Sequence, residues 1–111
     1  IYHATYRQVP GGVQRITEAQ LGTADDLASD LLAAGAEVLL VGDGARRYRE
    51  VFDGLARVEH AEVGNPFPSA SSLVQLAHPQ ALREDFEQPE SIVPLYLRRP
   101  DAEINWSTRD R

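Results

Sequence analysis

Two stretches near the start of the chain alternate between apolar and polar residues with a period of two. The first covers residues 2–7 and the second covers residues 13–21. Between them lies Val9-Pro10-Gly11-Gly12, in which proline and glycine supply the backbone angles of a tight connection. The pattern predicts an antiparallel hairpin in which each strand has one face that is more polar than the other.

Three later stretches carry the spacing of amphipathic helices. Thr23 and Asp26 are typical of a helix start, and Gly35 is typical of the end of that helix. A second helix is expected just after residue 44, and Ser69 caps a third, which Pro79 stops or bends. The apolar positions that define the three helices are Leu27, Leu31 and Ala34, then Tyr48, Val51, Phe52 and Leu55, then Ala70, Leu73, Val74 and Ala77.

Two short segments are predicted to be strands, and the first of them is predicted to be a parallel strand. Residues 38–41 are apolar on both faces, which suits a strand covered on each side, and residues 57–62 suit a shorter strand. The Asn65-Pro66-Phe67-Pro68 run predicts an extended turn, and residues 88–91 predict a loop. The order of elements predicts an α/β fold, a mixed sheet with helices on its faces. A segment before Ile1 is expected to add a strand beside the buried one.

Composition limits the class of protein. The 111 residues, 42% of them hydrophobic, suit one domain spanning residues 1–111, with residues 100–111 as a loosely packed tail around Ile104 and Trp106. No methionine is present, so the chain reads as a processed or truncated product. The absence of cysteine and of a long apolar run favours a cytoplasmic protein without disulfides or a membrane span. A net charge of -6 argues against a principal nucleic-acid binder.

Gly42-Asp43-Gly44 follows a predicted strand and precedes a predicted helix, where glycine can let backbone amides approach a phosphate. The full glycine motif is broken because Arg47 stands at the third glycine position. The alternative is a tight strand-to-helix turn without a ligand. These three residues are the only weak candidates for a cofactor site, and no cofactor is expected.

Other reactive side chains have structural explanations that compete with a catalytic one. The three histidines lack the spacing of a metal site, so no metal is expected. The acidic pairs at residues 25–26 and 84–85 suit a first helical turn and a solvated face, and the serines near residue 70 lack a nucleophile elbow. The arginines at positions 46, 47, 49, 98 and 99 could hold phosphate or tRNA, or form a solvated surface. Tyr96 and Leu97 are expected to anchor a terminal strand in the core.

The chain resembles the C-terminal half of the bacterial TsaB (YeaZ) family. The matching stretches are Ile1-Tyr2-His3-Ala4-Thr5-Tyr6, Val41-Gly42-Asp43-Gly44, Pro68-Ser69-Ala70 and the ending Val93-Pro94-Leu95-Tyr96-Leu97-Arg98, which continues through Ile104-Asn105-Trp106. The ending is the most specific part, and Tyr96, Leu97 and Arg98 are its signature residues.

The resemblance implies the second lobe of an actin-like, ribonuclease-H-like protein. It further implies a noncatalytic subunit that pairs with TsaD and TsaE in forming N6-threonylcarbamoyladenosine on tRNA, with tRNA contacted indirectly. The family's main contact with TsaD lies in the N-terminal lobe, which this sequence does not contain. An exposed sheet edge beside the first strand would favour a homodimer. The alternatives are a nucleotide-binding lobe of an actin-like phosphotransferase and, ranked last, a glycoprotease-like peptidase.

Overall fold

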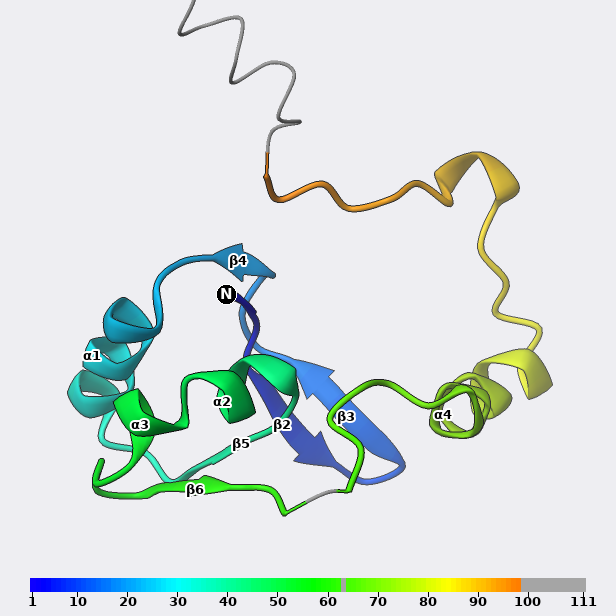
Figure 1. Cartoon of the computed structure of the whole chain (residues 1–111). Coiled ribbons are helices and arrows are strands. Elements are labelled where there is room, and N and C mark those ends of the chain that lie inside the picture. The colour runs from blue at the N-terminus through cyan, green and yellow to red at the C-terminus, as the bar shows by residue number, and fades with distance from the viewer. Residues whose placement is uncertain (63, 99–111) are drawn as a thin grey trace, which may run out of the picture.

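The computed structural model describes residues 1–62 and 64–98, and its body is a small α/β unit (Figure 1). Four short strands open the chain: β1 (Tyr2–His3), β2 (Tyr6–Val9), β3 (Gly12–Arg15) and β4 (Gln20–Leu21). The remaining elements follow in the order α1 (Ala24–Ala34), β5 (Val38–Leu40), α2 (Asp43–Arg47), α3 (Arg49–Phe52), β6 (Val58–His60), α4 (Ala70–Leu82) and the 3-10 helix η1 (Pro89–Ser91).

The predicted hairpin is present, but its two strands are each interrupted. β2 pairs with β3 around the Pro10-Gly11 turn, and β1 pairs with β4, both antiparallel. Between the two ladders, residues 4–5 lie opposite residues 16–19, so the second strand carries two extra residues and bulges. The amides of Ile16 and Thr17 both donate to the Thr5 carbonyl, at 2.7 and 3.3 Å, and accommodate the bulge.

The α1 helix begins and ends as the sequence predicts. The Thr23 hydroxyl accepts a hydrogen bond from the Asp26 amide at 3.1 Å and donates one to the Asp26 carboxylate at 2.7 Å. Gly35 adopts the left-handed conformation, with φ of 63°, and its amide donates to the Leu31 carbonyl. Ser69 caps α4 in the same manner as Thr23, by accepting from the Ser72 amide.

Two helix predictions need correction. The second helix is not continuous, because Tyr48 has φ of -108° and ψ of 30°, which separates α2 from α3. Of the two alternatives predicted for Pro79, a stop or a bend of the third helix, the stop is wrong, because α4 continues to Leu82. A proline removes the hydrogen bond to the carbonyl four residues earlier, but the following amides still close the last turn. The Arg83 amide donates to the Pro79 and Gln80 carbonyls at 3.3 and 3.1 Å.

The single mixed sheet that the sequence predicts is not formed by the described residues, which instead make three two-stranded sheets. Both strands predicted in this region are present, and β5 and β6 pair in parallel with each other, with Leu39 opposite Glu59. The prediction that residues 38–41 are covered on both faces is wrong, because Leu39 is 59% exposed and Val41 is 69% exposed. Figure 1 shows α1, α2 and α3 on one side of the β5–β6 pair and leaves the other side without a helix.

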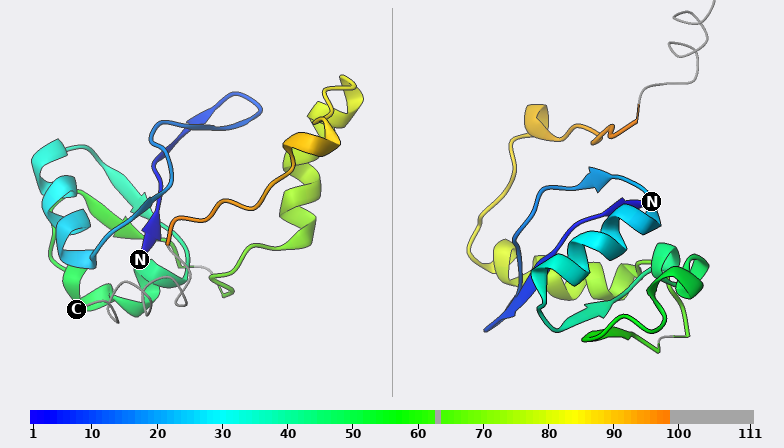
Figure 2. Two further views of the ribbon diagram at one scale, coloured as in Figure 1. Left: turned by 90° about the horizontal axis from the view of Figure 1, so that it is seen from above. Right: turned by 90° about the vertical axis from the view of Figure 1, so that its left-hand side faces the viewer.

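The core lies between α1, α3 and the covered face of β5–β6. Phe52 is 1% exposed and packs with Ala24 and Ala28, and partly buried apolar side chains surround these three, namely Ile1, Leu27, Leu31, Leu40, Val51 and Leu55. By contrast, every residue of α4 is exposed, and the helix stands away from the body in Figure 1 and in the left view of Figure 2.

Replacing Phe52 should test this core directly. We expect Phe52→Ala to lower the free energy of unfolding by about 3–5 kcal/mol, because it removes the one large, fully buried side chain of the described core. Urea denaturation followed by circular dichroism measures the change. Phe86→Ala is the matched control, since Phe86 is 69% exposed, and it should change the free energy by less than about 0.5 kcal/mol. Equal effects of the two substitutions would contradict this assignment of the core.

Candidate functional site

The Gly42-Asp43-Gly44 turn joins β5 to α2, as the sequence predicts. Gly42 has φ of 97°, a backbone conformation that favours glycine, and Asp43 is exposed in the first turn of α2. The helix that follows has only five residues, so its dipole is small, and the Asp43 carboxylate occupies the end where an anion would bind. This geometry favours the tight turn over the phosphate site.

Gly44 lies at the meeting point of the turn and the first strand. A Cβ atom built on Gly44 would lie 3.6 Å from the Ile1 Cγ2 atom, which is ordinary van der Waals contact. The amino group of Ile1 donates to the Gly22 carbonyl at 2.7 Å, and the Gly22 amide donates to the Ile1 carbonyl at 3.0 Å. The start of the chain is thus attached both to the β4 end of the hairpin and to the turn after β5.

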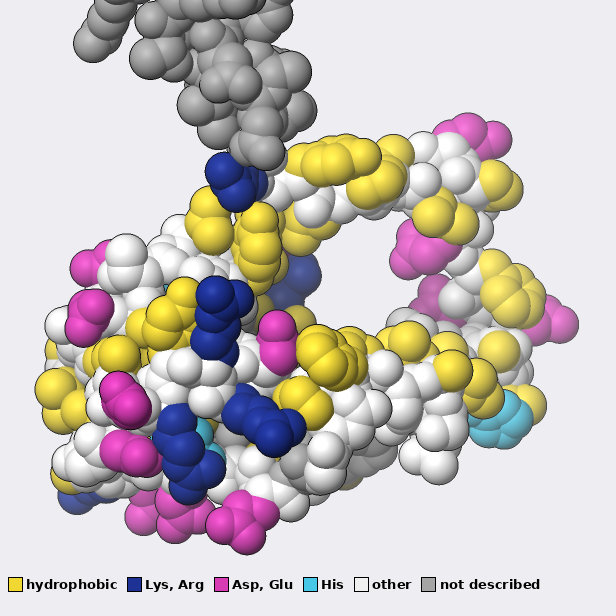
Figure 3. Space-filling view, in the orientation of Figure 1, with side chains coloured by type: hydrophobic (Ala, Val, Ile, Leu, Met, Phe, Trp, Pro, Cys, Tyr) yellow, Lys and Arg dark blue, Asp and Glu magenta, His cyan; other side chains and the backbone are white. Residues whose placement is uncertain are grey.

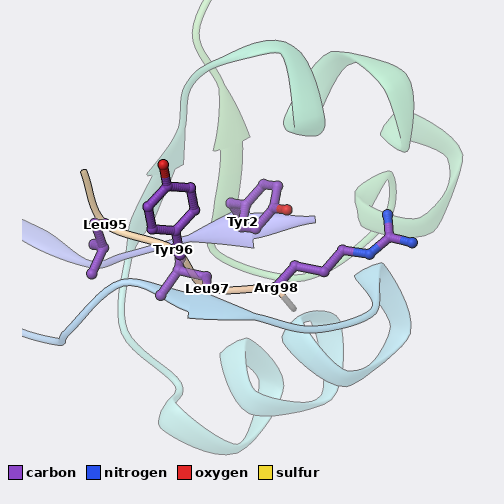
Figure 4. Close-up of a pocket in the computed structure, with 5 residues that line it drawn as sticks. All are labelled: Tyr2, Leu95, Tyr96, Leu97 and Arg98. Atoms are coloured by element: carbon purple, nitrogen blue, oxygen red, sulfur yellow. The ribbon is translucent and has the colours of Figure 1, made fainter. Parts of the chain in front are cut away.

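The signature residues of the ending lie over β1 and border an open hollow of about 270 Å³. Figure 4 shows Tyr96 beside Tyr2, with the Arg98 side chain extending away from both tyrosine rings. Tyr96 is 80% exposed and no strand forms around it, so the prediction that Tyr96 anchors a terminal strand in the core is wrong. Leu97 is half-buried, but it does not belong to the core either.

Leu21 extends the apolar lining of this region. It is the cross-strand partner of Tyr2, and the side chains of directly paired residues lie on the same face of an antiparallel ladder. Tyr2, Leu95 and Tyr96 are exposed and line the same hollow, and we call these three residues, with Leu21 beside Tyr2 on the ladder, the tyrosine surface. Its members come from β1, β4 and the ending of the chain.

The arginines of the α2–α3 segment line a mixed, solvated surface. All eleven basic residues of the chain are arginine, and those at positions 46, 47 and 49 are exposed. The Arg47 guanidinium lies 5.8 Å from the centre of the Tyr48 ring, and Arg49 forms an ion pair with Asp53 at 3.6 Å. The same segment carries exposed acidic residues at positions 43, 50 and 53, which weaken any field that would attract a polyanion, and Figure 3 shows basic and acidic side chains interspersed on one face of the body. Arg99 lies outside the described residues.

The remaining candidates have structural partners. Asp26 and Ser69 serve helix caps, and the Ser69 hydroxyl also donates to the Ser72 hydroxyl at 2.7 Å. In the part of the chain that the structure describes, no group of three or more histidine or acidic side chains is placed to hold a metal ion. No helix of that part is both long and apolar enough to cross a membrane.

His60 is a core contact that the sequence reading did not single out. Its ring is tilted against Phe52 at 6.4 Å between ring centres, and its Nε2 atom lies 3.5 Å from the Asp53 carboxylate without a hydrogen bond. The sequence contains a signal for this packing, because the alternation Val58-Glu59-His60 puts His60 on the same face of the strand as Val58. Packing therefore accounts for this histidine.

Comparison with known proteins finds no protein family, no curated protein and no solved structure that matches the chain.

The two glycines of the turn should respond differently to the same substitution. We expect Gly42→Ala to lower the free energy of unfolding by about 1–2 kcal/mol, because a side chain is strained at φ of 97° even though the space around it is open. Gly44→Ala should be neutral or should raise the free energy of unfolding by up to about 1 kcal/mol, because alanine favours a helix more than glycine does and the new methyl group meets Ile1 at ordinary contact distance. Urea denaturation compares the two variants. A larger loss for Gly44→Ala would contradict the assignment of Gly42 as the strained position.

Proposed function

We propose that the chain belongs to a noncatalytic scaffold subunit of the TsaB type, which pairs with TsaD, and with TsaE, in forming N6-threonylcarbamoyladenosine on tRNA. The proposal starts from the resemblance of the ending, centred on Tyr96-Leu97-Arg98, and of the opening residues around Tyr2. These two stretches, far apart in the sequence, lie together at the tyrosine surface. The proposed place of action is the cytoplasm, where tRNA is modified.

The observation that carries the proposal is the exposure of the tyrosine surface. Tyr2 is 63% exposed, Leu95 is 70% exposed and Tyr96 is 80% exposed, and these three residues line the same hollow. Clustered apolar residues that include tyrosine are typical of the centres of protein–protein interfaces, because the ring adds a large contact area at low entropy cost while the hydroxyl stays hydrogen-bonded. A protein partner is therefore the ligand that suits this surface best.

A nucleotide-binding lobe is the second candidate, and it would act at Gly42, Asp43 and Gly44. The carboxylate of Asp43 in the first turn of a five-residue helix disfavours a bound phosphate. The peptidase alternative ranks below it, since the side chains that could serve it at Ser69 and Asp26 are engaged in helix caps. Titration of the protein with ATP, measured by isothermal titration calorimetry, tests the nucleotide-binding alternative separately.

The scaffold proposal predicts dependence on the tyrosine surface in a two-lobed TsaB protein that contains this sequence. We expect that protein to bind purified TsaD and to stimulate the formation of N6-threonylcarbamoyladenosine on tRNA in an assay that contains TsaD and TsaE. Tyr96→Ala should weaken the affinity for TsaD about tenfold, which corresponds to about 1.4 kcal/mol. Phe86→Ala is the control, because Phe86 is similarly exposed and does not line the hollow.

Two results would contradict the proposal in different ways. If the two-lobed protein fails to bind TsaD or to stimulate modification, the proposed scaffold function itself is contradicted. If the two-lobed protein binds TsaD and Tyr96→Ala does not change the affinity, the scaffold function would stand, but the tyrosine surface would not be part of the contact with TsaD. Running the chain of 111 residues in parallel shows whether this half binds TsaD without the N-terminal lobe.

A further inference from the structure

The hollow at the tyrosine surface lies where the described part of the chain ends. Leu95, Tyr96, Leu97 and Arg98 line it together with Tyr2 (Figure 4). Arg98 is the last described residue, and residues 99–111 lie outside the described part. Because residue 99 is bonded directly to Arg98, the rest of the sequence starts at the rim of the hollow.

The walls of the hollow are mainly apolar and open to solvent. Tyr2, Leu95 and Tyr96 each leave more than half of their surface exposed, although all three line a volume of about 270 Å³. A tyrosine ring packs well against another aromatic ring, and its hydroxyl oxygen can accept a hydrogen bond. The side chain that suits this hollow best is therefore aromatic and carries one hydrogen-bond donor.

The sequence after Arg98 supplies such a side chain. Its large apolar residues are Ile104 and Trp106, and Trp106 is the only tryptophan of the chain. The indole ring is aromatic, and its one polar group is an N–H donor. A stretch of eight residues separates Trp106 from Arg98 and can span about 27 Å when extended. This length is enough for the chain to turn back to the hollow at which the segment starts.

We propose that Trp106 docks in the hollow of its own chain, against Tyr2, Leu95 and Tyr96, and that residues 99–111 thereby cover the tyrosine surface. Docking removes apolar area of the indole and of the hollow from water. The contact forms within one chain because a short tether gives Trp106 an effective concentration in the millimolar range. A partner that uses the tyrosine surface has to displace Trp106, which lowers the apparent affinity of that partner. The inference does not depend on the proposed function.

The single tryptophan makes fluorescence a specific probe of this contact. Quenching of the Trp106 emission by acrylamide measures how accessible the indole is to solvent. The full chain, in buffer and in urea, is compared with Tyr96→Ala and Leu95→Ala, and circular dichroism checks that both variants are folded. Neither residue lies in a helix or a strand, so neither substitution is expected to unfold the body. Phe86→Ala is the control, because Phe86 is 69% exposed and does not line the hollow.

We expect the quenching constant to be several-fold lower in buffer than in urea, to rise several-fold in Tyr96→Ala and in Leu95→Ala, and to stay unchanged in Phe86→Ala. An indole that is as accessible in buffer as in urea would overturn the inference. Protection that survives both substitutions in the hollow would place Trp106 elsewhere and would also overturn it. Protection that is lost on dilution would assign the contact to a second copy of the chain instead. The experiment contains no TsaD, so its result is separate from the test of the scaffold proposal.

Discussion

The packing of Phe52 against α1 is the interaction on which the body of the protein depends. Two alanines, Ala24 and Ala28, face the ring, and their small side chains let the helix approach it closely. On the other side, the ring meets His60 of β6, and Leu40 of β5 completes the contact. A single aromatic side chain therefore joins both strands of the parallel pair to α1 and α3. Such a small core makes only a modest contribution to stability, so the free energy of unfolding of this chain is expected to be small.

The one-sided position of this core explains the distribution of apolar residues over the surface. All three helices of the body lie on the Leu40 face of β5–β6, so the opposite face presents Leu39 to solvent. Apolar side chains on α4 and on the ending are exposed for the same reason, since neither segment reaches the core. Exposed apolar area of this extent costs free energy in water, and this cost favours contacts made within the chain or with a partner.

Local chemistry made much of the secondary structure predictable. Thr23, Gly35 and Ser69 set helix limits through hydrogen bonds to residues within four positions, and a sequence pattern records such short-range bonds directly. The break at Tyr48 was not predictable, because the apolar spacing continues across it and only the backbone angles interrupt the helix. The bulge at residues 16–19 was missed for a similar reason, since the alternation of residue types tolerates two extra positions.

The candidate sites also differ in whether short-range or long-range interactions determine their positions. The Gly42 turn could be placed from the sequence, because a strand, a glycine with positive φ and a helix follow one another along the chain. Tyr96 could not be placed, because its position depends on the ending lying over β1, more than ninety residues away in the sequence. An aromatic residue among leucines predicts burial by composition alone, and only three-dimensional packing decides whether the ring faces the core or a partner. The exposure of the Tyr96 ring is therefore a result of three-dimensional packing that its sequence context does not predict.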